Sequence, residues 1–392
     1  MSDGLSIGLY TYSTQPRGSV VHCAALADAL SARGHAVTVY ALAKPGAEAF
    51  FRALDAQLVL IACAPAPAGS AALIAQRIAE FARCIRELMP EHDIHHAQDS
   101  LAANALLRGR PRHGAVVRTV HHVERFASDS LREYQARSIQ EVDAILSVSE
   151  LTQQDVWRDY GVASQRVHNG VERARFGRAS AGSVAQLRRK LGISESEPVI
   201  VSFGGIEPRK NTLRLLSAFS ALRAQLPARW VIVGGASILD HSAYRDEFER
   251  QLALCGEDTR RSVVCTGVLS ESEVTATYGL AHVVAAPSLQ EGFGLVALEA
   301  LAAGVPLVAS RRAPFTEYLD DGCAWLVDPE NCAGLTLALR EALQGSPERV
   351  RRGLERARGF DWECVAREHE ALYRKLAYAR PSQQGWSRNR YA

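Results

Sequence analysis

The sequence predicts an α/β fold made of two consecutive domains, each built on a mostly parallel sheet. Short apolar runs typical of buried strands alternate with helical patterns through both halves, and this alternation is typical of a parallel sheet. In each half the first strand leads into a glycine-containing turn and then into a helix. A length of 392 residues leaves room for two domains of about 150–200 residues each.

Charge balance and cysteine pattern exclude several classes of protein. Lys plus Arg number 45 and Asp plus Glu number 43, so the net charge of +2 argues against nucleic acid as a partner. The eight cysteines form no Cys-x-x-Cys pair and no zinc-binding spacing with histidine, which indicates reduced thiols. The sequence shows no leader and no apolar run that approaches a membrane span. We therefore expect a soluble, cytoplasmic protein.

The first half, residues 1–172, contains a regular series of predicted elements. Strands are expected over 5–12, 36–41, 58–61, 93–97, 115–120 and 144–149, the last being the final strand of this half. Helices are expected over 20–33, 74–89 and 150–160, with Asp99 or Ser100 as the cap of another. The amphipathic helix 74–89 leaves two alternatives open, packing on a sheet or weak contact with a membrane surface.

The second half, residues 173–360, repeats the alternation. Strands are expected over 198–203, 230–235, 262–267, 282–286 and 307–309. Helices are expected over 212–226, 295–301, 331–343 and 347–356, and another begins at a capping box, Ser270 to Glu273. A final helix runs from Trp362 to about residue 376 and precedes a polar tail from Pro381.

The most informative stretch is residues 291–310. Glu291 is followed by Gly292, Phe293 and Gly294, and an apolar helix that carries Glu299 comes next. Glycines before a helix let backbone N–H groups approach a ligand closely, and the positive end of the helix dipole suits a phosphate. The two acids would repel a phosphate but accept hydrogen bonds from neutral hydroxyls beside it. Diphosphate flanked by hydroxyls describes a nucleotide sugar, whereas the plain alternative is an amphipathic helix after a glycine turn.

This stretch resembles the acid-seven-acid signature of retaining glycosyltransferases of family 4, glycosyl transferases group 1, which have the GT-B fold. The resemblance implies two Rossmann-like domains facing a central cleft, with residues 361–392 returning toward the N-terminal, acceptor-side domain. It implies that Glu291 contacts the donor sugar and that Glu299 binds the ribose. The diphosphate would be held by the amides of the Gly-Phe-Gly turn, residues 292–294, and by the start of the helix at Leu295.

Two further loops match the family less closely. Gly18 resembles the first glycine of the family's Gly-Gly loop, whose amides face the donor phosphate and the acceptor, but Ser19 replaces the second. In the second half Gly204 opens a loop that ends in Arg209 and Lys210, just before a helix. Lys is a strong point charge for phosphate and Arg adds a bidentate fork. A solvated pair of charges is the alternative, which the helix dipole disfavours.

Gly205 occupies the position at which many family members carry an Arg, so we expect Arg209 to take over that role. His121 ends a predicted strand, and the resemblance implies that it approaches the donor sugar. The family often has Asp at the next position, where this chain has His122. The alternative for His121 is a loop histidine satisfied by its neighbours.

We therefore predict an enzyme, a hexosyl- or glycosyltransferase that moves a sugar from a nucleoside diphosphate to an acceptor with retained configuration. No Gly-x-Gly-x-x-Gly, Walker lysine or Asp-x-Asp motif occurs, so we expect no cofactor and no metal. Retention is implied by the resemblance, and we expect a front-face displacement because the sequence places no carboxylate as a covalent nucleophile. The predicted catalytic residues are Glu291, His121, Arg209 and Lys210. The acceptor, whether small molecule, glycan or lipid-linked, stays open. So do two other functions, a GT-B nucleotide-sugar epimerase or phosphorylase and a non-catalytic nucleotide-sugar-binding protein.

Overall fold

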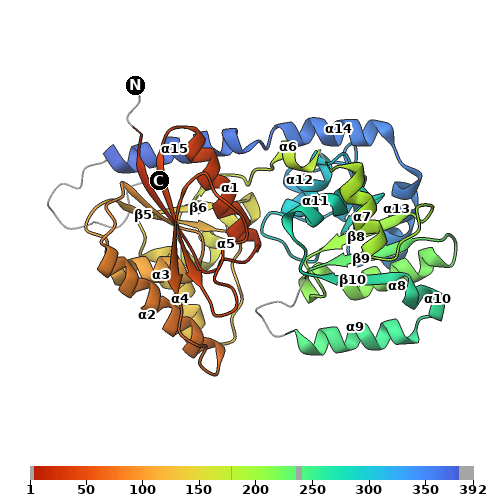
Figure 1. Cartoon of the computed structure of the whole chain (residues 1–392), viewed down its shortest axis with the longest axis horizontal. Helices are drawn as coiled ribbons and strands as arrows, with labels where there is room; N and C mark the ends of the chain where they lie inside the picture. Colours follow the sequence, from red (N-terminus) through yellow and green to blue (C-terminus); the bar gives the residue numbers. More distant parts are fainter. Residues whose placement is uncertain (1–3, 178, 235–240, 379–392) are drawn as a thin grey trace. The chain divides into compact units, whose positions relative to one another are not determined.

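The computed structural model describes residues 4–177, 179–234 and 241–378 (Figure 1). Contacts divide the chain into two compact units. Unit 1 consists of two segments of the chain, one that ends at Gly170 and one that begins at Trp362. Unit 2 comprises Val171–Asp361. Two α/β units, each with its own parallel sheet, confirm the predicted fold class.

Unit 1 alternates strands and helices as the sequence predicts. Its elements are β1 (Ser6–Thr11), α1 (Gly18–Ala32), β2 (Ala36–Ala43), β3 (Gln57–Ala62), α2 (Ser70–Leu88), β4 (Ile94–Ala97), α3 (Ser100–Gly109), β5 (Ala115–Val120), α4 (Asp129–Gln140), β6 (Ala144–Ser147), α5 (Glu150–Tyr160), β7 (Gln165–Arg166) and α15 (Trp362–Tyr378).

The sheet of unit 1 has the order β3-β2-β1-β4-β5-β6-β7, and all neighbouring strands are parallel. The first strand lies inside the sheet and the chain winds outward from it in both directions, which places helices on both faces. One apolar core forms between the sheet and helices α1 and α15, and another forms on the opposite face with α2 and α3. Strands buried on both faces explain the near-continuous apolar runs in the sequence.

The structure resolves two alternatives and corrects one expectation in unit 1. Ile78, Phe81 and Ile85 of α2 are buried in the core, so the apolar face of this helix packs on the sheet. Asp99 is the cap of α3, because its carboxylate accepts from the Ala102 N–H at 2.8 Å. The strand at 144–147 is not the last of this half, since β7 pairs with it. A strand of two residues is too short to leave a periodic pattern.

Unit 2 contains a second sheet with the order β10-β9-β8-β11-β12-β13, again parallel between neighbours. Its elements are α6 (Arg173–Phe176), α7 (Ala181–Lys190), β8 (Val199–Phe203), the 3-10 turn η1 (Pro208–Lys210), α8 (Thr212–Arg223), β9 (Arg229–Val233), α9 (Ser242–Leu254), α10 (Glu257–Arg261), β10 (Val263–Gly267), α11 (Glu271–Leu280), β11 (Val283–Ala286), α12 (Leu295–Ala302), β12 (Leu307–Ser310), the 3-10 turn η2 (Phe315–Glu317), β13 (Trp325–Val327), α13 (Cys332–Gln344) and α14 (Pro347–Arg358).

Apolar side chains cover both faces of this sheet. Helices α8, α9 and α13 pack on one face, and α7 and α11 pack on the other. The predicted capping box of α11 is confirmed, with Ser270 and Glu273 each accepting from the other's backbone N–H. The predicted end of β9 at Gly235 and the tail from Pro381 fall outside the described residues.

Two further expectations can be compared with the structure. All eight cysteines are free thiols, as the spacing predicts. Among the helices that the structure describes, none combines the length and the apolar character needed to cross a membrane.

Candidate active site

The candidate site of unit 2 lies where the order of strands reverses. β8 pairs with β9 on one side and with β11 on the other, and such a reversal leaves a crevice at the carboxyl ends of the strands. The loop after β8 carries Arg209 and Lys210, and the loop after β11 carries Ser288 and Glu291. The topology therefore brings together side chains that are 81 residues apart in the chain.

An asparagine fixes the basic turn against the second loop. Asn211 ends η1 with φ of +60° and is buried, and its side-chain amide donates to the carbonyls of Pro287 and Pro329 at 3.1 and 2.7 Å. The carbonyl of Arg209 in turn accepts from the Leu289 N–H at 2.8 Å. Asn tolerates this left-handed conformation better than most residues, which explains its place between the turn and α8.

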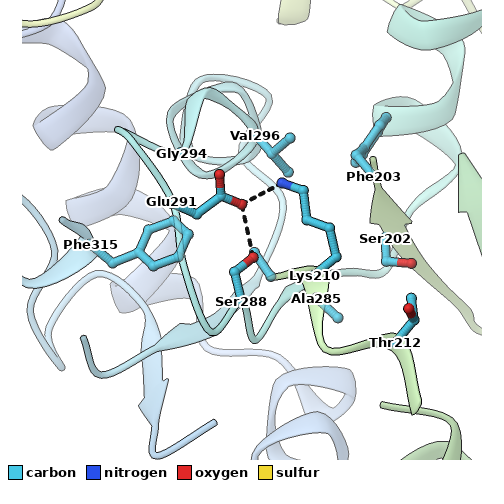
Figure 2. Close-up of a pocket in the computed structure, with 11 residues that line it drawn as sticks. Ser202, Phe203, Lys210, Thr212, Ala285, Ser288, Glu291, Gly294, Val296 and Phe315 are labelled. Atoms are coloured by element: carbon cyan, nitrogen blue, oxygen red, sulfur yellow. Dashed lines mark hydrogen bonds and ion pairs between the residues drawn. The ribbon is translucent and has the colours of Figure 1, made fainter. Parts of the chain in front are cut away.

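Glu291 is the centre of a cluster of charges (Figure 2). Its Oε1 forms an ion pair with Lys210 Nζ and accepts from the Ser288 hydroxyl at 2.8 Å. Its Oε2 lies 3.3 Å from Arg209 Nη1, and Arg209 Nε also pairs with Glu207 at 2.8 Å. The side chains of Lys210 and Glu291 are only 13% and 9% exposed, whereas that of Arg209 is 45% exposed. The alternative of a solvated charge pair therefore does not describe Lys210.

These contacts determine the charge of Glu291. Burial alone would raise its pKa, but the positive charges of Lys210 and Arg209, with the hydrogen bond from Ser288, lower the pKa below its ordinary value. Burial lowers the pKa of Lys210, although Glu291 acts in the opposite direction. Glu291 is thus an ionised acceptor of hydrogen bonds and is poorly suited to donate a proton.

Gly204 provides space for the lysine. Its φ is +101°, and a Cβ at this position would lie 2.5 Å from Lys210 Cε. The N–H groups of Gly204 and Gly205 both donate to the carbonyl of Val233, at 2.8 and 3.1 Å. Gly204 therefore acts in this structure by letting the stem of Lys210 cross the strand end, and its amide is already engaged.

A tyrosine holds the backbone of the Gly-Phe-Gly turn in place. The Tyr318 hydroxyl lies 3.0 Å from the carbonyls of both Phe293 and Gly294, and its ring stacks on Phe293 with centroids 5.0 Å apart. Gly294 has φ of +89° and caps α12, so the amides at the start of this helix, beginning with Leu295, point out of the turn. A Cβ at Gly294 would collide with the ring of Phe315. Only glycine fits this position.

Glu299 lies one to two turns inside α12 and has a different environment. It accepts from the Tyr278 hydroxyl at 2.5 Å, and Tyr278 is buried between Phe203, stacked at 4.6 Å, and Phe176. Burial raises the pKa of Glu299, while Tyr278 and Arg175 act in the opposite direction. Tyr278 could not be identified from the sequence, because a tyrosine on the buried face of a helix is usually a core residue.

A pocket joins the two loops and the start of α12 (Figure 2). It is lined by Ser202, Phe203, Lys210, Thr212, Ala285, Ala286, Ser288, Glu291, Gly294, Val296 and Phe315. The hydroxyl groups of Ser202, Thr212 and Ser288 were not predicted from the sequence. Serines and threonines are common at strand ends, so their positions carry no signal by themselves.

The remaining predicted residues, Gly18 and His121, belong to unit 1. Gly18 is the first residue of α1, and a Cβ there would meet nothing within 4 Å. His121 follows β5, and its Nε2 lies 3.3 Å from Gln98 Oε1. Burial and the neighbouring His122 lower the pKa of His121 to about 3, so its imidazole is neutral. His122 is exposed and pairs with Glu124 at 2.6 Å.

Comparisons with known proteins identify the family of this chain. The family model described as "Glycosyl transferases group 1" matches residues 183–358, and "Glycosyltransferase Family 4" matches residues 16–175. A Mycobacterium tuberculosis GDP-mannose-dependent alpha-(1-6)-phosphatidylinositol monomannoside mannosyltransferase is 30% identical over 89% of this chain and 90% of its own. A Nocardioides D-inositol 3-phosphate glycosyltransferase is 29% identical over 91% of this chain and 85% of its own.

The fold also matches a solved structure. Sucrose-phosphate synthase from Thermosynechococcus elongatus superposes with a TM-score of 0.77, 19% identity and coverage of 96% of this chain and 100% of that one. Two α/β units, each with its own parallel sheet, together with this match identify the GT-B fold of glycosyltransferases. The chain belongs to the group 1 glycosyltransferases, as the signature at residues 291–299 predicts.

Proposed function

We propose that this glycosyltransferase transfers a sugar from a nucleoside diphosphate to a hydroxyl group of its acceptor, with retained configuration and without a metal ion. The observation that carries the proposal is the buried pairing of Lys210 with Glu291, joined by the more exposed Arg209, beside the Gly-Phe-Gly turn. In this proposal the two cations and the N-terminus of α12 bind the diphosphate, and Glu291 accepts from hydroxyls of the transferred sugar.

The contacts of Glu291 favour front-face displacement over a covalent intermediate. Both of its carboxylate oxygens already accept ion pairs or hydrogen bonds, and its pKa is lowered. A carboxylate whose lone pairs are engaged by cations is a weak nucleophile. Its Oε2, which among the described residues contacts only Arg209, can still accept a hydrogen bond from a sugar hydroxyl. The acceptor hydroxyl would then attack from the side of the leaving diphosphate and pass its proton to a phosphate oxygen. Lys210 and Arg209 would stabilise the negative charge that grows on the departing diphosphate.

Glu299 is proposed to bind the ribose hydroxyls. Tyr278 occupies Oε2 of this carboxylate, so Oε1 would accept from the ribose. The donor base and sugar are proposed from the relatives. GDP-mannose is the first candidate, because the Mycobacterium tuberculosis relative is named as dependent on it. Acceptors are proposed from the same names, as an inositol phosphate or a phosphatidylinositol mannoside. His121, neutral and next to Gln98, would approach the sugar as a hydrogen-bonding group.

A direct assay tests the proposal. The protein is incubated with GDP-mannose or another nucleotide sugar and a candidate acceptor, and free nucleoside diphosphate is measured together with the anomeric coupling of the product. Release of diphosphate with a retained anomer is expected, and activity should persist in excess EDTA. Loss of activity in EDTA with rescue by Mg²⁺ would contradict metal independence. An epimerase would convert the donor without an acceptor, a phosphorylase would need inorganic phosphate, and a binding protein would show no turnover.

A further inference from the structure

A second group of cations lies in unit 1, at the carboxyl ends of β1 and β2. These strands are parallel neighbours, with Thr11 opposite Ala41. The loops that follow them are tied together, because the Thr14 hydroxyl donates to the carbonyl of Ala47 at 2.6 Å and the Phe51 N–H donates to the carbonyl of Thr14 at 3.0 Å. Tyr12, Arg17 and Lys44 are therefore carried by two loops that are fixed to each other.

Lys44 and Arg17 have no acidic partner within the part of the chain that the structure describes. The ammonium of Lys44 lies 5.2 Å from the centre of the Tyr12 ring, and no carboxylate lies within 4.0 Å of either cation. Buried cations elsewhere in this unit have polar partners: Arg77 pairs with Glu80 at 2.5 Å, and Arg118 donates to the Ser138 hydroxyl and the Gln135 carbonyl. Buried or half-buried charges are normally paired, so two unpaired cations close together indicate a missing anion.

The surroundings of Arg17 and Lys44 supply more positive than negative charge. Burial and the positive charge of Arg17 lower the pKa of Lys44. Asp99 acts on Lys44 only at a distance and raises its pKa slightly, because the Asp99 oxygens accept from the N–H groups of Tyr12 and Ala102 at 2.9 and 2.8 Å. Burial raises the pKa of Asp99 itself to about 6. The N-terminus of α1 begins at Gly18, directly after Arg17, and adds a positive dipole end in open space.

We propose that Arg17 and Lys44 bind a phosphate group carried by the acceptor. The inference rests on the proposed function and assigns two residues of unit 1 to the phosphate of its proposed acceptors. A phosphate suits the pair, because Arg offers a planar fork of donors and Lys offers a point charge. The ammonium of Lys44 lies over the Tyr12 ring, and this cation–π contact positions it before the anion arrives. Both a soluble phosphate ester and a lipid phosphodiester present this chemistry.

The test measures phosphate binding separately from sugar transfer. Full-length protein is first saturated with nucleoside diphosphate, which fills the proposed donor site, and is then titrated calorimetrically with glycerol 3-phosphate. We expect binding by the parent and a loss of about tenfold or more in the Arg17→Gln/Lys44→Met double variant. Methionine replaces the lysine by an apolar side chain of similar length. A Lys44→Arg single variant, which keeps both positive charges, should bind glycerol 3-phosphate again. The Arg86→Gln variant is the matched control, since it removes an exposed cation of the same unit at the end of α2 and should bind glycerol 3-phosphate as the parent does.

A second arm identifies the source of the phosphate. Vesicles of phosphatidylglycerol are compared with vesicles of phosphatidylcholine in a sedimentation assay. Binding to the anionic vesicles that disappears in the double variant assigns a lipid phosphodiester, and binding of glycerol 3-phosphate alone assigns a soluble ester. Absence of binding to both probes, or equal binding by parent and double variant, overturns the proposal. Failure of the proposed function is distinct, because it would appear as intact donor turnover in Lys210→Ala.

Discussion

The hydroxyl of Tyr278 donates to Oε2 of Glu299 at 2.5 Å, from a ring that is buried between Phe203 and Phe176. A donor so firmly packed fixes the orientation of the carboxylate and leaves one defined oxygen for a ligand. Tyr278 is therefore a positioning residue for Glu299. The hydrogen bond also favours the ionised carboxylate, since it opposes the rise in pKa that burial causes.

Replacement of Tyr278 by Phe should shift the pH dependence of nucleotide binding. Without the hydroxyl the pKa of Glu299, already raised by burial, should rise further, so the carboxylate is protonated at a higher pH. Affinity for the nucleoside diphosphate should then begin to fall at a higher pH in Tyr278→Phe than in the parent. Calorimetric titrations from about pH 5 to about pH 8 measure this, and titration of the diphosphate itself cancels between the two proteins. Superimposable profiles would refute the positioning role.

Lys210→Ala and Arg209→Ala should each lose about 2–4 kcal/mol of transition-state stabilisation, measured as kcat/KM. Each variant removes a charge that would face the leaving diphosphate. Lys190→Ala is the matched control, because Lys190 also forms an ion pair with a glutamate, Glu273, but on an exposed helix. Values for both site variants within about threefold of the control would show that these cations do not serve the reaction.

The two acids of the signature should differ in what they bind. Glu299→Gln should weaken binding of both the free nucleoside diphosphate and the donor, because it would remove a contact to the ribose. Glu291→Gln should reduce turnover but bind the diphosphate at least as tightly as the parent, since Lys210 and Arg209 lose a competing negative charge. Titration of both variants with the diphosphate decides the matter. A larger loss at position 291 than at 299 would reverse the assignment.

Gly204→Ala should displace Lys210 and lower kcat/KM by about tenfold or more, because the added methyl group meets the lysine stem and the backbone has positive φ. Gly345→Ala separates the two causes. It imposes a similar backbone strain, with φ of +79°, but in open space. Both variants should lose stability in thermal melts, and only Gly204→Ala should lose activity. Equal activities would mean that Lys210 has room to adjust.

Acid should destabilise unit 1 through its buried histidines. Burial lowers the pKa of His369 to about 4, and the unfolded chain binds a proton near pH 6.5, so stability falls as the pH drops between these values. For this one group the loss is on the order of 3 kcal/mol. His369→Asn keeps a donor for the Val365 carbonyl, which His369 Nδ1 contacts at 2.9 Å. Its midpoint in urea should therefore fall less between about pH 6.5 and about pH 4.5 than that of the parent.

The elements that could be predicted from the sequence are those that leave a pattern in consecutive residues. Strands such as β1, β8 and β12 are buried on both faces and appear as apolar runs, and the capping box of α11 is a local pattern. Helices α4, α7 and α9 were missed, because they bury few residues and their polar surfaces hide the helical period. Strand β13 has only three residues and is defined by its pairing with β12.

The candidate site shows the same division. Glu291, Lys210 and Gly294 could be proposed as candidates, because glycines before a helix start and cations close in sequence are the pattern expected of a phosphate-binding turn. The residues that hold these candidates in place could not be identified from the sequence. Asn211 acts through carbonyls at residues 287 and 329, and Tyr318 acts through those of residues 293 and 294. Such contacts depend on the tertiary fold and leave no spacing pattern in the chain.

The discontinuity of unit 1 has a consequence for protein synthesis. The core beneath α1 includes Trp362, Val365 and Tyr373 of α15, and the Trp362 ring lies so close to Gly170 that a Cβ there would be 2.6 Å from it. A ribosome delivers these residues only after all of unit 2 has been made. Unit 2 can therefore complete its fold during translation, whereas the apolar face of α1 must wait for the last helix. A nascent or truncated chain that ends before Trp362 should be bound by chaperones that recognise exposed apolar surface.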